Sequence, residues 1–170
     1  MKKVFTIAAA ATALTMASAH AETVKIGYMT TLSGKAGIIG KQMQNAVELA
    51  LEHKGGKLGG MDADVIFVDD QRKPEVAKQL ANRLIKSDRV DVVAGVIWSN
   101  LLMAVHKPIT RSGTLLISSN AGPSPVAGKD CHENFFSMSW QNDQTPEAMG
   151  KYMQDCLLYT SDAADDLYRG

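Results

Sequence analysis

The sequence lacks an excess of charge of either sign and has only two cysteines and four histidines. Lysine plus arginine number 18, as do aspartate plus glutamate, so the 170-residue chain has no basic field of the kind that holds nucleic acid. With 45% apolar and 21% charged residues, its composition is that of a globular protein. We therefore expect a folded domain with a sizeable core and no nucleic-acid partner.

Motifs for nucleotide binding and covalent catalysis are also absent. Gly34, Gly37 and Gly40 are spaced three apart, which is not the G-x-G-x-x-G that brings a backbone close to a pyrophosphate. Lys35 follows a glycine, but the other residues of a phosphate-binding loop are missing. No G-x-S-x-G nucleophile elbow occurs. The sequence therefore predicts no cofactor and no enzyme activity.

The histidines and paired aspartates offer little more chemistry. His53, His106 and His132 lack metal-ligand spacing, so we expect them on helix surfaces or in loops, with no metal site. Asp69 and Asp70 are adjacent at the end of a predicted strand, where neighbouring side chains point to opposite faces. They are therefore predicted to be loop or cap groups rather than an acid/base pair.

Residues 1–21 are typical of a secretory signal peptide. Lys2 and Lys3 precede an apolar run from Val4 to Ala17, and small residues follow before a polar segment. The apolar run is shorter than the ~20 residues that a bilayer-spanning helix needs. We expect this segment to be removed and the mature protein to be exported.

Residues 156–170 differ in composition from what precedes them. The letters CLLYTSDAADDLYRG resemble a translated adapter of transposon-based sequencing libraries, so we expect this tail to be non-native and the natural sequence to break off near Asp155. An oxidising compartment favours disulfides, and Cys131 and Cys156 are the available pair. The origin of the tail argues against that bridge.

Apolar periodicity predicts strands that alternate with helices. Strands are predicted at 24–29, 65–68, 90–97, 114–118 and 134–137, and helices at 41–53, from Pro74, from about Asn100 and from Pro146. The second helix is predicted to bury Val76, Ala77, Leu80, Ala81, Leu84 and Ile85. Pro108 is expected to end or kink the third helix. The alternation predicts an α/β fold with a doubly wound parallel sheet.

The third predicted strand ends at Trp98, Ser99 and Asn100. In open α/β sheets, ligands bind outside the carboxyl ends of the strands. Ser99 and Asn100 also begin a helix, where free backbone N–H groups favour an anion, so a carboxylate could be bound there. Equally, Ser99 or Asn100 could simply cap the helix, and spacing alone does not separate the two interpretations.

The fourth predicted strand has a similar exit. Asn120, Ala121, Gly122 and Ser124 offer amides, carbonyls and one hydroxyl on a backbone open to close approach. Two neighbouring exits rich in small polar groups favour a binding site over a mere helix cap.

These stretches together resemble a known family. VKIGYMTTLSGKAGIIGKQMQNAVELALE, GGKLGG, FVDDQRKP and the two exits are similar to the start of type I periplasmic solute-binding proteins, in particular the branched-chain amino acid binding proteins of ABC importers. The likeness covers nearly all of residues 22–155. It implies a monomeric periplasmic protein that closes two lobes on a small ligand and delivers it to an inner-membrane permease.

The resemblance also implies roles for residues. Ser99 and the backbone at Asn120 to Gly122 would hold a ligand carboxylate, and Asn142 or Asp143 would lie near an amino group. The first lobe would span residues 22–140, with the hinge and the start of the second lobe at 141–155. Because the chain is expected to lack most of the second lobe, we expect these residues alone to fold marginally and bind poorly.

Departures from the family bear on the ligand. Ile39 replaces a ligand-facing tyrosine, and Arg72 and Trp98 stand where a cysteine pair is expected. With GVIWSN, NAGPS and CHENFFSMSWQND, these features look more like the branch that binds aromatic carboxylates. Trp98 and Trp140 could stack on a ligand ring, or could pack in the core.

Two other functions remain open at this level. A receptor's ligand-sensing domain has the same fold, and an exported α/β hydrolase would use a similar lobe. The hydrolase requires a nucleophile with a base, and none is visible before Asp155.

Overall fold

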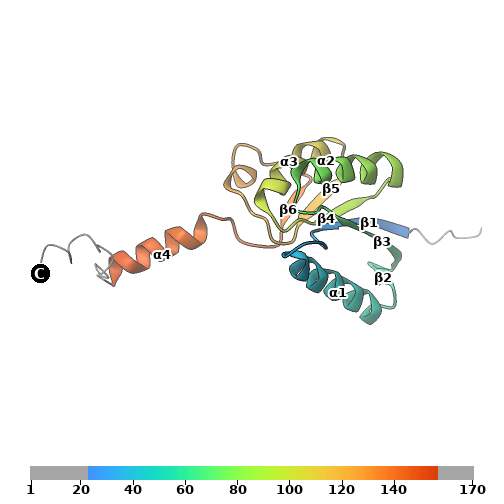
Figure 1. The fold of residues 1–170 in the computed structure, drawn as a ribbon, viewed down its shortest axis with the longest axis horizontal. Coiled ribbons are helices and arrows are strands. Elements are labelled where there is room, and N and C mark those ends of the chain that lie inside the picture. Colours follow the sequence, from blue (N-terminus) through green and yellow to red (C-terminus); the bar gives the residue numbers. More distant parts are fainter. Residues whose placement is uncertain (1–22, 157–170) are drawn as a thin grey trace, which may run out of the picture.

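A computed structural model of the chain describes residues 23–156 (Figure 1). The predicted signal peptide at 1–21 lies outside the described residues, as does the predicted non-native tail from residue 157 onwards.

Six strands form one sheet in the order β2-β3-β1-β4-β5-β6. The strands are β1 (Thr23–Thr30), β2 (Lys57–Leu58), β3 (Met61–Asp69), β4 (Val92–Gly95), β5 (Leu115–Ser118) and β6 (Phe135–Ser137). All neighbouring pairs are parallel except β2 with β3, which is antiparallel. The predicted parallel α/β fold is confirmed, but the short edge strand β2 was not predicted.

Helices cover both faces of the sheet, which makes it doubly wound (Figure 1). The helices are α1 (Gly37–His53), α2 (Pro74–Arg83), α3 (Ser99–Arg111) and α4 (Gln144–Asp155), with short helical turns at Leu84–Asp88 and Ser124–Ala127. Both α2 and α3 pack on one face and α1 lies on the other, whereas α4 extends away from the sheet. The first helix, α1, begins at Gly37, one turn before the predicted start at residue 41.

The main core lies between the sheet and the α2–α3 layer. Its fully buried side chains include Met29, Val93, Leu101, Leu102 and Leu116. Of the six residues predicted to form the buried face of the second helix, three are buried and three are partly buried. The core thus follows from the helical spacing of apolar residues.

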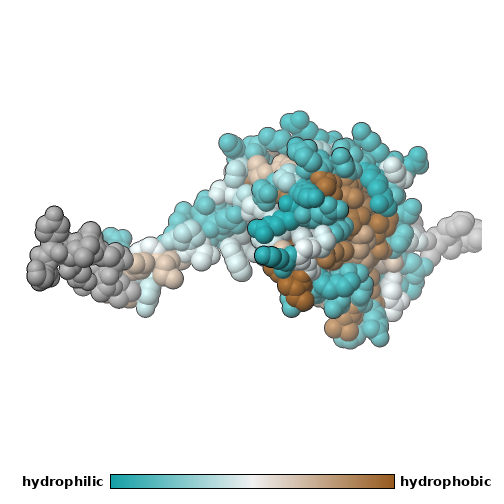
Figure 2. Space-filling view, viewed as in Figure 1, coloured by the Kyte–Doolittle hydropathy of each residue, from teal (hydrophilic) through white to brown (hydrophobic). Residues whose placement is uncertain are grey.

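The α1 face is packed less completely. A groove of about 190 Å³ between α1 and the sheet has an apolar lining made of Ile26, Tyr28, Val47, Ala50, Leu51, Leu58, Val65 and Ala94. Figure 2 shows apolar residues gathered between the α2–α3 layer and α1, and also on α1, while hydrophilic residues cover most of the α2–α3 layer. On α1, the side chains of Ala46 and Ala50 are exposed.

Glycines set the approach of α1 to the sheet. A Cβ at Gly40 would lie 1.9 Å from the carbonyl oxygen of Thr31, and one at Gly37 would lie 2.5 Å from that of Leu32. Such contacts are closer than any real side chain allows, so α1 can begin directly against the end of β1 only with glycine at these positions.

The predicted end of the third strand, just before α3, was wrong. The strand predicted at 90–97 ends at Gly95, because Gly95 and Val96 have positive φ angles of 104° and 63°, which an extended strand cannot accommodate. The Val96 N–H instead donates to the carbonyl oxygen of Met29 at 2.7 Å. Of the two effects expected of Pro108, ending the helix is not observed, because α3 continues to Arg111.

His106 is buried, contrary to the predicted surface position. Its side chain is 2% exposed and its ring lies 5.0 Å from that of Phe135, in edge-on geometry. Among the described residues, neither ring nitrogen has a hydrogen-bond partner. Burial lowers the pKa of His106 below its ordinary 6.5, the nearby His132 and Lys107 lower it further, and Asp130 opposes them.

We expect His106 to make stability depend on pH. Because its folded-state pKa is lowered, the unfolded chain binds an extra proton just below pH 6.5, and stability is lost as the pH falls through that range. Urea titrations between pH 5 and 8 are expected to show a slope of at most ~1.4 kcal/mol per pH unit from this group, abolished in His106→Leu. His53→Leu, which removes an exposed imidazole, is the control. An unchanged slope in His106→Leu would contradict the assignment.

Candidate ligand-binding site at the strand exits

Parallel pairing brings the carboxyl ends of β1, β4, β5 and β6 to one edge of the sheet. The polar residues that follow these strands therefore meet there. They belong to four segments: 30–32, 98–100, 118–124 and 138–143.

Ser99 is the first residue of α3, and Trp98 precedes the helix in extended conformation. In the described part of the chain, no side chain forms a capping hydrogen bond at the start of α3. The alternative in which Ser99 or Asn100 simply caps the helix is therefore not observed. The first helical bond runs from the Leu102 N–H to the carbonyl oxygen of Trp98 at 2.9 Å. The preceding N–H groups have no acceptor within the helix, so this end of α3 presents donors.

The Ser99 hydroxyl is oriented by a residue far along the chain. The side-chain amide of Asn142 donates to Ser99 Oγ at 2.9 Å. Because Ser99 accepts this bond, its own hydroxyl proton remains free to be donated. The backbone N–H of Asn142 donates to the carbonyl oxygen of Gly122 at 2.8 Å. Three of the predicted site residues are thus brought together.

Gly122 allows the segment after β6 to cross close to the β5 exit. A Cβ at this position would lie 2.3 Å from the carbonyl oxygen of Trp140. Two hydrogen bonds fix the preceding Ala121. Its N–H donates to the carbonyl oxygen of Val96 at 3.2 Å, and its carbonyl oxygen accepts from Ser118 Oγ at 2.5 Å. The backbone of the β5 exit is therefore held at the β4 exit.

Three other predicted site residues form hydrogen bonds within this region. The Asn120 side chain donates to the carbonyl oxygen of Ile97 at 2.9 Å. Ser124 Oγ donates to the carboxylate of Asp143, which also accepts from Gln141 Nε2 at 2.9 Å. The bond from Ser124, followed by that from Gln141, lowers the pKa of Asp143, so this carboxylate stays charged at neutral pH.

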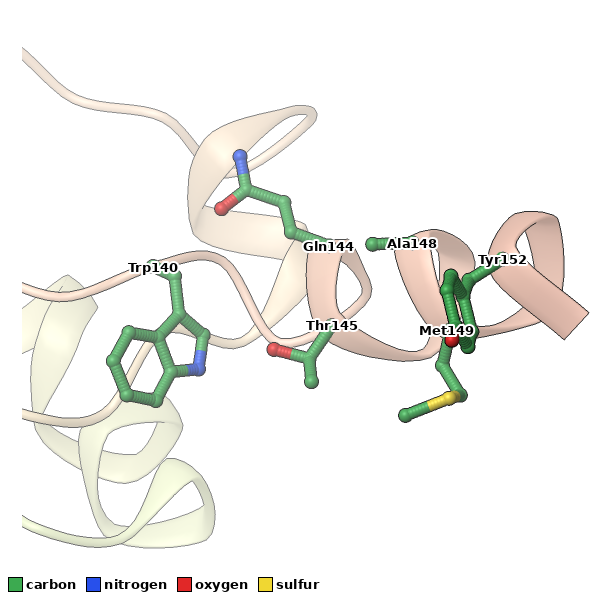
Figure 3. Close-up of a pocket in the computed structure, with 6 residues that line it drawn as sticks. All are labelled: Trp140, Gln144, Thr145, Ala148, Met149 and Tyr152. Atoms are coloured by element: carbon green, nitrogen blue, oxygen red, sulfur yellow. The ribbon is translucent and has the colours of Figure 1, made fainter.

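The two tryptophans differ in environment. Trp98 is partly buried, its Nε1 donates to Thr31 Oγ1 at 2.9 Å, and the Arg72 guanidinium lies over its ring at 4.0 Å. Trp140 is 64% exposed and lines a pocket of about 480 Å³ with residues of α4 (Figure 3). A second hollow of about 290 Å³, beside Gly122, also reaches Trp140.

The aspartates after β3 support loop backbone, as predicted. Asp69 Oδ1 accepts from the N–H groups of Leu32 and Gln71 at 2.8 and 2.9 Å. Partial burial raises the pKa of Asp69, but these bonds outweigh it and the pKa is lowered. Asp70 is fully buried, which raises its pKa, and it accepts from the Thr31 hydroxyl at 2.5 Å.

Thr31, Asp70 and Arg72 were missed as part of this region. The signal was present, since Thr31 follows β1 and both Asp70 and Arg72 follow β3, as Ser99 follows β4. Applying the strand-exit rule to the first two predicted strands as well would have found them.

Metal and membrane features are few in the described part of the chain. No three His, Cys, Asp or Glu side chains gather there in a way that could hold a metal ion. None of the helices between residues 23 and 156 combines the length and the apolar character needed to cross a bilayer. Cys131 and Cys156 are both exposed and unbridged.

The structure is thus a doubly wound lobe whose strand exits gather backbone donors and small polar groups. The chain belongs to the periplasmic binding protein family, whose sequence profile matches residues 23–157. The resemblance to type I solute-binding proteins of ABC transporters is confirmed.

Three individual proteins that this chain resembles share 28% to 32% sequence identity with it. The Leu/Ile/Val-binding protein homolog 6 of Brucella abortus is 29% identical over 150 residues, covering 87% of this chain. The chain spans 38% of the length of that relative. A solute-binding protein of an ABC transporter from R. palustris, solved in complex with benzoate, is 32% identical with a TM-score of 0.74, over 79% of this chain and 38% of that one. A Rhodopseudomonas palustris BisB5 solute-binding protein in complex with 3,4-dihydroxybenzoic acid is 28% identical, with a TM-score of 0.64 over 70% and 32% of the two chains.

Proposed function

We propose that this chain supplies the first lobe of the solute-binding component of an ABC importer. It captures a small carboxylate in the periplasm and delivers it to an inner-membrane permease. The observation that carries the proposal is the Ser99 hydroxyl at the start of α3, held by Asn142 with its proton free to donate. Membership of the periplasmic binding protein family supports the transport role and the compartment.

The proposed carboxylate site combines side-chain and backbone donors. Ser99 donates its hydroxyl to one carboxylate oxygen, and the N–H groups of Asn100 and Leu101 at the helix start favour the negative charge. The backbone from Asn120 to Gly122 forms the neighbouring wall. Each charge-assisted bond of this kind contributes about 1.5–3 kcal/mol.

An aromatic acid is the favoured ligand class. The benzoate complex of the R. palustris relative, 32% identical to this chain, supports it. Trp140, whose ring is largely exposed beside Gly122, provides the stacking surface. Trp98 is less suitable because Arg72 already covers one face of its ring.

A branched-chain amino acid is the second candidate. Asp143 carries a lowered pKa and lies next to Asn142, so its carboxylate is available in charged form to bind an ammonium group. The Leu/Ile/Val-binding relatives support this alternative. In this alternative, the ammonium group of the ligand must compete with the Ser124 hydroxyl for the Asp143 carboxylate.

The proposed lobe boundary falls where the chain leaves the sheet. Residues 22–140 form the first lobe, the segment from Ser139 to Asp143 is the crossing, and 141–155 begins the second lobe. Along α4, Thr145, Met149 and Tyr152 follow Trp140 and line the pocket in Figure 3. We propose that the second lobe of a monomer packs on this face.

A melting-temperature screen of the whole protein tests the function. Benzoate, 4-hydroxybenzoate, leucine and isoleucine are compared at equal concentration. A ligand that binds only the folded state stabilises it by about 2.7 kcal/mol at 100 times its Kd, so benzoates are expected to raise the melting temperature by several degrees. A shift with the amino acids alone would overturn the aromatic assignment, and no shift with any compound would overturn the carboxylate site.

A further inference from the structure

We propose that Trp98 is a positioning residue whose indole, clamped by Thr31 and Arg72, fixes the start of α3 and with it the Ser99 hydroxyl. This inference rests on the proposed function, in which Ser99 binds the ligand. The sequence left Trp98 either to stack on a ligand ring or to pack in the core; its partly buried ring packs against the core, and the positioning role adds to that packing.

Four residues form a closed ring of contacts, here called the Asp70–Trp98 circuit: Asp70, Thr31, Trp98 and Arg72. Trp98 Nε1 donates to Thr31 Oγ1 at 2.9 Å, and the Thr31 hydroxyl donates to Asp70 Oδ1 at 2.5 Å. The same Asp70 oxygen accepts from the Arg72 N–H at 2.8 Å. The Arg72 guanidinium then returns to the Trp98 ring, 4.0 Å from its centroid.

The circuit joins three strand exits. Arg72 follows β3, Thr31 follows β1 and Trp98 follows β4, in the order in which these strands lie in the sheet. Because β1 separates β3 from β4, no backbone pairing connects the two outer exits directly. The circuit supplies that connection through side chains.

The backbone conformation at Gln71 and Arg72 supports the circuit. Gln71 and Arg72 have φ angles of 52° and 57°, a left-handed conformation that is unfavourable for residues other than glycine. The carboxylates of Asp69 and Asp70 accept the N–H groups of these two residues and so stabilise the turn. The consequence of this turn is that the Arg72 side chain lies over Trp98.

Burial strengthens the circuit. Asp70 is 0% exposed and Thr31 is 1% exposed, so water does not compete for the hydrogen bonds between them. Within residues 23–156, Arg72 forms no ion pair, so the indole is the group that its charge contacts. Trp98 is thereby held at its edge and on one face, immediately before Ser99 in the chain.

The first experiment tests the circuit without any ligand. The sequence contains two tryptophans, so ¹⁵N-labelled whole protein gives two indole N–H resonances, assigned with Trp140→Phe. The Trp98 indole proton is expected to exchange with solvent at least tenfold more slowly than that of Trp140, and Thr31→Val or Arg72→Gln is expected to accelerate it. The control Lys73→Gln changes an exposed cation in the same turn and is expected to have no effect. Equal exchange of the two indoles would overturn the circuit.

The second experiment measures binding with benzoate and isoleucine as probes. Thr31→Val is expected to weaken binding of the probe that binds by about three- to tenfold, and Thr31→Ser to restore it, because only the hydroxyl is needed. Trp98→Phe removes the same link while leaving the bond from Thr31 to Asp70 intact. The double variant is therefore expected to be no weaker than either single variant.

The outcomes separate the two hypotheses. Faster indole exchange in Thr31→Val with unchanged probe affinity would overturn the positioning role and leave the proposed function standing. If neither probe binds the unmodified protein, the proposed carboxylate site fails and the positioning role fails with it, whereas the circuit itself is judged by indole exchange alone.

Discussion

Replacing Ser99 by alanine is expected to weaken binding of the carboxylate ligand by about 10- to 100-fold. The variant removes a hydroxyl that donates to a charged group, a bond that contributes about 1.5–3 kcal/mol. It also leaves the Asn142 amide without its acceptor at 2.9 Å. Calorimetric titration of the whole protein with the compound that gives the largest melting shift provides the measurement.

Ser112→Ala is the matched control for this substitution. Ser112 lies at the opposite end of α3, where its hydroxyl donates to the carbonyl oxygen of Ile109 at 2.6 Å. Its loss is expected to lower stability slightly and to leave affinity unchanged. If Ser99→Ala binds as tightly as the unmodified protein, the ligand lies elsewhere and the carboxylate site proposed here is wrong.

The sheet and its helical layers could be predicted because they depend on local apolar patterns. Along α2 and the helical turn that continues it, Ala77, Ala81 and Leu84 recur at helical spacing and all three are buried. The same rule, applied to α3, would have placed His106 inside, because it shares a face with Leu102 and Ile109. That prediction failed because the residue type was weighed above its position.

The ends of the strands could not be predicted in the same way. Val96 belongs to an apolar run that favours a strand, yet its φ of 63° turns the chain out of the sheet. The reason is tertiary, since the N–H of Val96 is bound by Met29 on the neighbouring strand. The turn at Gln71 and Arg72 is held by the carboxylates of Asp69 and Asp70, two residues earlier, but the tryptophan that Arg72 then contacts is distant in the sequence.

The candidate site was predicted in outline and not in its pairings. Strand-exit reasoning placed Ser99 and Gly122 at the same edge, because parallel strands end together. That Asn142 would bond Ser99, and that Ser124 would bond Asp143, depends on the path of the chain after β6. Such pairs are separated by 43 and 19 residues, and no local pattern encodes them.

Gly122→Ala is expected to reduce both stability and binding. The new Cβ would lie 2.3 Å from the carbonyl oxygen and 3.2 Å from the carbonyl carbon of Trp140. These are backbone atoms, so no rotamer change relieves the overlap and the crossing segment must move. That movement breaks the bond from the Asn142 N–H to Gly122 and withdraws the Asn142 amide from Ser99. We expect a loss of about 1–3 kcal/mol in the free energy of unfolding and at least a tenfold rise in Kd.

Gly150→Ala is the control, because a Cβ at that position on α4 meets nothing within 4 Å and alanine favours a helix. Urea unfolding and calorimetric binding are measured on both variants. Ser99→Ala removes the hydroxyl that contacts the ligand and accepts from Asn142, whereas Gly122→Ala keeps that hydroxyl and alters the path that delivers Asn142 to it. A Gly122→Ala protein with unchanged stability and Kd would mean that the crossing segment does not pack against the β5 exit. In that case the orientation of Ser99 by Asn142 would have no structural basis.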